Sequence, residues 1–168
     1  MGNWVGKLKS VNGILFGCRN EGNELWAMLL EKAYAKAYGS FMTIEGKGGS
    51  PRDALRDLTG APSYIKRHEK LTDDELWDFV HTAEQKNWII CTGTNATAIR
   101  EEKNELGIQA GHAYSILDSV EVTTDSGRKE RIIQIRNPWG KTEWNGDWGD
   151  KSSLWTKSTK EQVGGLLD

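Results

Sequence analysis

The sequence predicts an α+β fold, in which helices occupy the first half of the chain and antiparallel strands the second. Between positions 24 and 87 apolar residues recur at helical spacing, with capping signals ahead of them. From position 88 onward the pattern changes to short apolar runs divided by turn signals. Helices that are segregated from antiparallel strands are typical of α+β domains, whereas alternating helices and strands are typical of α/β domains.

The first helix is predicted over residues 24–38. Its apolar positions follow helical spacing, with Asn23 as the N-cap and Gly39 as the stop. Before it, residues 4–17 are expected to form short strands around an Asn12-Gly13 turn.

Two more helices are predicted from their start signals. Ser50 followed by Pro51 is a helix start, and that short helix is expected to run to about Leu58 and end at Gly60. Thr72 to Glu75 forms a capping box, which opens a helix that stops near Asn87. The glycine-rich stretch 46–49 is expected to be a flexible loop.

The second half of the chain predicts a β-hairpin with a further strand beside it. The expected strands are Trp88–Thr92, Gly111–Val122, which is long enough to bend, and Arg131–Arg136. A Ser-Gly turn within residues 123–129 joins the last two strands into an antiparallel hairpin. Residues 137–150 are rich in Gly, Trp and Asn, which indicates an ordered loop anchored by aromatic rings.

The length of 168 residues indicates a single domain over residues 1–168, or one modest lobe of a larger domain. The net charge of −2 gives no charge-based case for binding nucleic acid or a membrane surface. No apolar run approaches the roughly 20 residues that a bilayer requires, and the N-terminus has no secretory signal pattern. The two cysteines, Cys18 and Cys91, are too few for a disulfide scaffold and suit a reducing, cytoplasmic compartment.

His112 and Asn137 are the residues on which chemistry is predicted. His112 heads one hairpin strand and Asn137 ends the next, so the hairpin can place them side by side. An Asn oxygen that accepts from one ring N–H fixes the tautomer and leaves the other ring nitrogen to take a proton from a thiol. From spacing alone, the favoured interpretation is a structural His and a turn Asn with no joint role. His68 and His81 are expected at the surface.

Several motifs, in the same order, resemble the second subdomain of the protease core of calpains, the intracellular cysteine proteases. The matching segments extend from about residue 8 to the end of the chain, and they are Glu24-Leu25-Trp26, Leu29 to Lys36, Asp57-Leu58-Thr59-Gly60, Gly111-His112-Ala113-Tyr114-Ser115, Arg136-Asn137-Pro138-Trp139-Gly140 and Glu143 to Asp150.

The resemblance implies a papain-like second lobe with His112 as general base, Asn137 as its orienting partner and Trp139 as a shield over their bond. It also implies a missing part, because calpains carry the nucleophilic cysteine on a separate first subdomain, and no segment here matches that one. Cys18 is the rival nucleophile, but it lies before Asn23 rather than at the helix start, where a thiolate would be stabilised. Cys91 lies within an apolar run and is expected to be a core thiol.

Calcium is the cofactor that the resemblance implies. By match to the family, Glu143 and Asp150 are the candidate ligands, and their carboxylate oxygens suit calcium. A calcium site takes 6–8 ligands, and the remaining family ligands are expected beyond Asp168. The site is therefore expected to be incomplete in this chain, and a solvated acidic loop is the alternative interpretation.

Three functions are compatible with these features. The leading one is the His/Asn half of a calcium-dependent cysteine endopeptidase, which is inactive alone, works with the Cys-bearing first subdomain and cleaves intracellular proteins. The alternative is a subdomain of a catalytically inactive calpain-like protein that acts as a binding or regulatory module. The third is a free-standing papain-like enzyme that uses Cys18.

Overall fold

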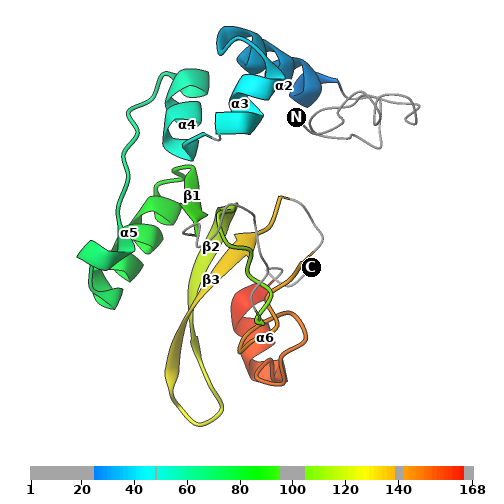
Figure 1. Cartoon of the computed structure of the whole chain (residues 1–168). Helices are drawn as coiled ribbons and strands as arrows, with labels where there is room; N and C mark the ends of the chain where they lie inside the picture. The colour runs from blue at the N-terminus through cyan, green and yellow to red at the C-terminus, as the bar shows by residue number, and fades with distance from the viewer. Residues whose placement is uncertain (1–24, 48, 95–104, 139–141, 165–168) are drawn as a thin grey trace, which may run out of the picture. The chain divides into compact units, whose positions relative to one another are not determined.

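The computed structural model describes residues 25–47, 49–94, 105–138 and 142–164 (Figure 1). The predicted Asn12-Gly13 turn and Asn23 cap, together with Cys18 and Trp139, lie outside these ranges. The chain divides into two compact units, Met1–Ser63 and Tyr64–Asp168, and each is described by itself. The fold is α+β, as predicted, and no helix in the described ranges is long and apolar enough to cross a membrane.

The first unit is helical over its described residues. Helix α2 (Trp26–Ala37) lies within the predicted 24–38 segment, and Gly39 follows its cap with a φ of 105°. Helix α3 (Phe41–Lys47) was not predicted, and the expectation of a loop from residue 46 is wrong for Gly46, which is helical. The signal for α3 is Ser40, whose side-chain oxygen accepts from the backbone N–H of Thr43 at 3.2 Å.

Helix α4 (Pro51–Thr59) begins at the predicted Pro and ends at Gly60, which is left-handed with a φ of 71°. Ser50 has the extended N-cap backbone but makes no side-chain cap hydrogen bond. The Tyr38 hydroxyl donates to the Asp57 carboxylate, which joins the end of α2 to α4. This bond, with a second from Arg56, holds the pKa of Asp57 below its usual value.

The second unit begins with a short 3-10 turn, η1 (His68–Lys70), and helix α5 (Asp73–Gln85). The capping box predicted at Thr72 is complete: the Glu75 N–H donates to Thr72 Oγ1 at 3.2 Å, and the Thr72 N–H donates to Glu75 Oε2 at 2.8 Å. Accepting that N–H stabilises the carboxylate and lowers the pKa of Glu75.

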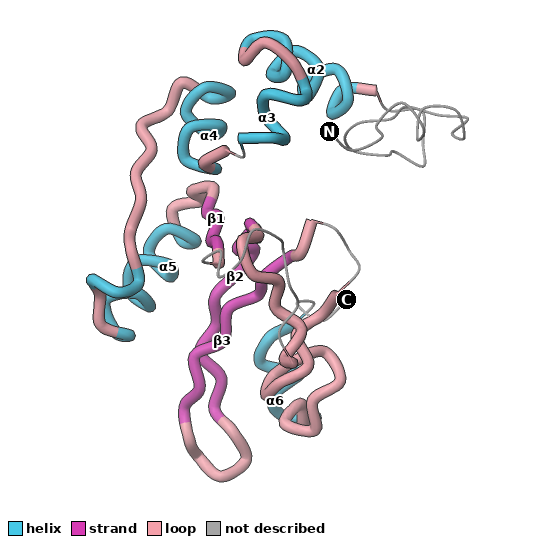
Figure 2. The backbone as a smooth tube through the Cα atoms, viewed as in Figure 1, coloured by secondary structure: helices cyan, strands magenta, loops and turns pink. Residues whose placement is uncertain are grey.

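Within the described residues the sheet has three antiparallel strands in the order β1-β2-β3, drawn in magenta in Figure 2. They are β1 (Ile90–Gly93), β2 (Ala113–Thr123) and β3 (Lys129–Arg136), so the predicted hairpin is confirmed and no boundary moves by more than two residues. The bend expected in the long strand is a register shift in β2 between Ile116 and Asp118. An extra residue on one strand of a pair increases its bend and twist.

Both faces of β2 are covered midway along the hairpin. Ser119 and Val122 are three positions apart, so they point to opposite faces, and they are only 4% and 0% exposed. Helix α5 packs on the Ser119 face, where His81 Nδ1 lies 3.0 Å from Ser119 Oγ. The expectation of a surface position is confirmed for His68 but wrong for His81, which is half-buried and stacked on Trp77.

Helix α6 (Lys157–Val163) also lies against β2 and was not predicted. Its start is a Thr156/Thr159 capping box, a signal present in the sequence. The Gln162 amide exchanges two hydrogen bonds with the Thr123 backbone, at 2.8 and 2.9 Å, which fixes α6 at the end of β2.

Candidate active site

His112 is held by its backbone at the start of β2. Gly111 turns the chain into the strand with a φ of 64°, in the left-handed region that glycine adopts readily. Thr94, which follows β1, then pairs with His112: the Thr94 N–H donates to the His112 carbonyl at 3.0 Å, and the His112 N–H donates to Thr94 Oγ1 at 3.0 Å. The backbone that carries the imidazole is therefore tied to the neighbouring strand from both directions.

Strand alternation places the His112 and Asn137 side chains on one face of the sheet. His112 and Tyr114 are two positions apart, and their rings meet edge-on with centroids 4.8 Å apart. Ser115 pairs with Arg136, so Asn137, one residue further along, lies opposite Tyr114 and shares its face.

The two candidate side chains meet in a hydrogen bond. His112 Nε2 and Asn137 Oδ1 are 2.9 Å apart, although 25 positions separate them in sequence. An amide oxygen only accepts, so the ring donates through Nε2–H in this arrangement. That tautomer places the ring's lone pair on Nδ1, the nitrogen that can receive a proton.

The amide nitrogen of Asn137 is bound to Thr142. Asn137 Nδ2 lies 2.9 Å from Thr142 Oγ1 and 3.2 Å from the Thr142 carbonyl oxygen. Both ends of the Asn137 amide are thus engaged, the oxygen by His112 and the nitrogen by Thr142.

The segments that flank the two residues are also bound to each other. Asn145 donates its backbone N–H to the Leu106 carbonyl at 3.0 Å and its side-chain amide to the Glu105 carbonyl at 3.2 Å. Trp144 donates its ring N–H to the Asp147 carbonyl at 2.7 Å. This bond is an aromatic anchor of the kind predicted for the loop. The turn before His112 and the loop after Asn137 therefore form one structure.

The His112 side chain is largely enclosed within this chain. The residue is only 6% exposed. The ring of Tyr114 and the side-chain amide of Asn137 pack against the His112 imidazole, which accounts for part of this burial. Asn137 itself is half-buried.

Cys91 does not share the face of His112. It pairs with Ser115, and Ser115 points to the face opposite His112 and Tyr114. The expectation of a core thiol is wrong, because Cys91 is exposed on the edge strand β1. Partial burial nevertheless raises the pKa of the Cys91 thiol, which disfavours the reactive thiolate.

Glu143 and Asp150 are both exposed. Within the described ranges no group of three or more His, Cys, Asp or Glu side chains is arranged to hold a metal ion. Carboxylates are the donor type that calcium prefers, but the donors gathered here fall short of the 6–8 that it takes. The loop after Asn137 therefore offers the type of donor that calcium prefers, but too few donors to complete a site.

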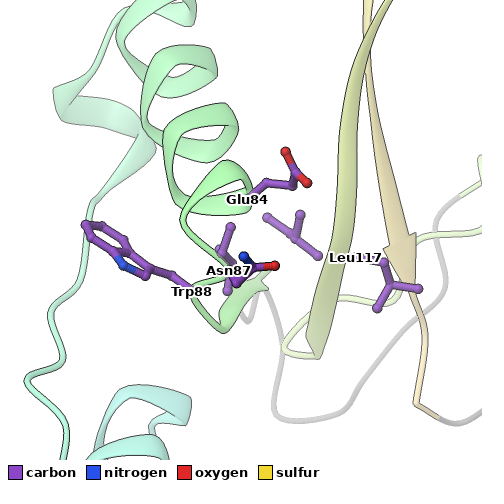
Figure 3. A pocket seen from close by; sticks show the side chains of 6 residues that line it. Glu84, Asn87, Trp88 and Leu117 are labelled. Carbon is purple, nitrogen blue, oxygen red and sulfur yellow. The ribbon is translucent and has the colours of Figure 1, made fainter.

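A shallow pocket of about 240 Å³ lies elsewhere on the second unit, between the end of α5 and strands β1 and β2 (Figure 3). Glu84, Asn87, Trp88 and Leu117 line it, with Ile90 and Ile116. It contains neither His112 nor Asn137, so it is separate from the candidate site.

Comparison with known proteins identifies the family of this chain. The sequence profile described as "Calpain family cysteine protease" matches residues 7–166. The chain belongs to the calpain family. It is 37% identical to the calpain-1 catalytic subunit of Rattus norvegicus over 82% of its length, and 39% identical to the calpain-type cysteine protease DEK1 of Zea mays over 88%. It is also 33% identical to calpain-5 of Mus musculus over 96% of its length.

This calpain-family chain is much shorter than the curated relatives it matches. The matches span 19% of rat calpain-1, 28% of mouse calpain-5 and 7% of maize DEK1. The family is that of cysteine proteases, which are thiol-dependent hydrolases.

Sequence reasoning missed Thr94 and Thr142, the two threonines that hold the pair. A register argument between β1 and β2 could have placed Thr94 opposite His112. Thr142 has no comparable signal, because its contact depends on how the loop after β3 folds back.

Proposed function

We propose that this chain is one subdomain, over residues 1–168, of a calpain-type cysteine endopeptidase, and that it supplies the histidine and asparagine of the active site. The observation that carries the proposal is the 2.9 Å contact between His112 Nε2 and Asn137 Oδ1. Its supports are the family match over residues 7–166 and the position of both side chains on one face of the sheet.

In the proposed reaction His112 transfers protons through Nδ1. With the Nε2 proton held by Asn137, Nδ1 accepts the proton of the cysteine thiol, and the thiolate attacks the peptide carbonyl. The imidazolium then returns that proton from Nδ1 to the leaving amine, which frees the first product. In the second half of the reaction Nδ1 takes a proton from the water that attacks the thioester carbonyl. As the carbon–sulfur bond breaks, the imidazolium returns that proton to the departing thiolate, which frees the second product and restores the thiol.

The proposed nucleophile is a cysteine outside this sequence, on a first protease subdomain. Cys91 points to the face opposite His112, and its pKa is raised rather than lowered. Cys18 is followed by Arg19, a cation that would favour its thiolate, but it lies before Asn23 rather than at a predicted helix start. The chain alone is therefore expected to lack peptidase activity, and its proposed setting is cytoplasmic, with proteins as substrates.

The test is to mix this chain with a Cys-bearing first subdomain of a calpain and to assay cleavage of a fluorogenic peptide, with and without calcium. We expect cleavage from the mixture and none from either half. Cleavage by this chain alone that is abolished by Cys18→Ser would overturn the proposal. Stable association of the halves without cleavage would instead support the alternative, a binding or regulatory module.

We also propose that Glu143 and Asp150 contribute to a calcium site that other donors complete. The support is the donor chemistry of two exposed carboxylates on the loop after Asn137. Calorimetric titration of the assembled halves should show weaker calcium binding for Glu143→Gln and Asp150→Asn than for Glu161→Gln, a matched change at an exposed position of helix α6. Equal affinity in all three variants would remove the two residues from the site.

A further inference from the structure

We infer that Thr142 is a positioning residue, which sets the ring tautomer of His112 by fixing the orientation of the Asn137 amide. The inference rests on the proposed function, because it concerns the same histidine and asparagine. It adds a residue that touches neither the imidazole proton acceptor nor the nucleophile, and that acts through Asn137.

The first step is the direction of the amide. A side-chain amide can turn over, which exchanges its oxygen and nitrogen at almost no change in shape. With the oxygen toward His112, the ring must donate from Nε2. With the nitrogen toward His112, the ring must accept at Nε2, and its proton moves to Nδ1. Only the first orientation leaves Nδ1 able to take a proton from a thiol.

The second step is what selects that orientation. Asn137 Nδ2 lies 3.2 Å from the backbone carbonyl of Thr142, and a carbonyl only accepts. Turning the amide over would set two acceptor oxygens against each other at this point. The Thr142 hydroxyl lies closer, at 2.9 Å from the same nitrogen, and accepts from it. The nitrogen of the amide is therefore held on the side away from His112.

The third step is what holds Thr142. The loop that follows it is bound to the turn before His112, through the Asn145 N–H on the Leu106 carbonyl at 3.0 Å. Glu143, the next residue, has its carbonyl against buried Gly107, where no side chain would fit. Thr142 is half-buried between these anchors and Asn137. A residue fixed in this way can impose one orientation on the amide.

The test is the tautomer of His112 in the chain itself, read from the ring ¹⁵N chemical shifts in long-range ¹H–¹⁵N spectra. His112→Gln identifies its signals among the three histidines. We expect wild type to hold the Nε2–H tautomer. Thr142→Val, which has nearly the same shape without the hydroxyl, should lower the ratio of Nε2–H to Nδ1–H by roughly threefold to tenfold, the factor associated with one neutral hydrogen bond.

Two further variants keep the experiment decisive. Thr142→Ser retains the hydroxyl and should restore the wild-type ratio, which a merely structural role for the methyl group would not do. Thr124→Val is the matched control, since its hydroxyl accepts from the Arg128 N–H at 3.0 Å in the turn at the other end of the hairpin. It should leave the His112 ratio unchanged.

An unchanged ratio in Thr142→Val would overturn the role inferred for the Thr142 side chain and would leave the orientation to the backbone carbonyl, which valine keeps. A Thr142→Ser ratio that follows Thr142→Val would overturn it as well. If Thr142→Val does not fold, Thr142→Ser alone decides, by keeping or losing the wild-type ratio. In the assembled protease the same valine change should lower kcat severalfold and leave KM unaltered. The tautomer result does not need activity, so it stands or fails separately from the proposed cleavage reaction.

Discussion

Gly107 lies directly against the backbone carbonyl of Glu143: a Cβ placed on Gly107 would stand 2.0 Å from that oxygen. The contact joins the turn that leads to His112 with the loop that leaves Asn137. Gly107 also has a φ of 94°, which side-chain-bearing residues rarely adopt. The contact between these two segments therefore requires a glycine at position 107.

Gly107→Ala should destabilise the second unit by about 2–4 kcal/mol, since it adds overpacking to backbone strain. The control is Gly127→Ala in the β2–β3 turn, where φ is also positive, at 81°, but nothing lies within 4 Å of the added Cβ. That change should cost only about 1–2 kcal/mol, from the left-handed backbone. Urea unfolding of both variants measures the difference. Equal losses would mean that the loop moves away without cost.

The His112–Asn137 pair should be essential in the assembled protease. His112→Ala removes the proton carrier and should lower kcat/KM by roughly 10²–10⁴-fold. Asn137→Ala leaves the imidazole in place without its orienting partner, and a loss of about 10²-fold is expected from misalignment. His68→Ala, at an exposed position on η1, is the control and should have wild-type kinetics. Peptide hydrolysis rates that are insensitive to His112→Ala would exclude the proposed reaction.

Cys91 should be dispensable for cleavage. It lies on the face of the sheet opposite His112, so Cys91→Ser should keep the activity of the assembled protease within about twofold. Burial raises the pKa of its thiol, so at neutral pH Cys91 should react with iodoacetamide more slowly than a free cysteine does. The rate is measured in a Cys18→Ser background. If Cys91 reacted faster than the free amino acid, the raised pKa of its thiol would be contradicted.

The start of helix α5 should weaken in acid. Bonds from Thr72 lower the pKa of Glu75 from its ordinary 4.5, so the folded state favours the carboxylate. The stabilisation is full above about pH 4.5 and is lost as the pH falls through the lower, folded-state pKa. The protection of the amides of residues 73–76 against hydrogen exchange, relative to the rate of an unstructured peptide at the same pH, should therefore fall in wild type below that pH.

Glu75→Gln should remove this pH dependence, because its side chain does not titrate. Glu69→Gln on η1 removes an exposed carboxylate from the same unit without touching the capping box, so its exchange profile should follow wild type. A wild-type pH response that persists in Glu75→Gln would assign the effect to another group.

The sequence by itself determined the secondary structure wherever the signal is local. The capping box at Thr72, the proline at the start of α4 and the Ser-Gly turn of the hairpin each involve residues within a few positions of one another. Such contacts form within a single turn of chain, so their pattern is visible in sequence. Helices α3 and α6 were missed because they are short, with seven residues each, and their caps are weaker signals.

The sequence predicted only part of the candidate site. The hairpin made a His112–Asn137 pair possible and the resemblance to calpains implied it, and in the structure the two side chains lie 2.9 Å apart. The surroundings of the pair were not predicted. The burial of His112, the exposure of Cys91 and the half-buried, stacked position of His81 all depend on which element covers which face of the sheet. Packing between distant segments decides that, and periodicity in one segment does not record it.

The tertiary structure alone decided what holds the site together. Thr94 reaches His112 across a strand pair, and Thr142 reaches Asn137 because its loop returns to the turn at Gly107. Each of these contacts is a hydrogen bond or close approach whose geometry tolerates only a few tenths of an ångström. The sequence supplied the two residues that are proposed to carry the chemistry, and the fold supplied the neighbours that aim them.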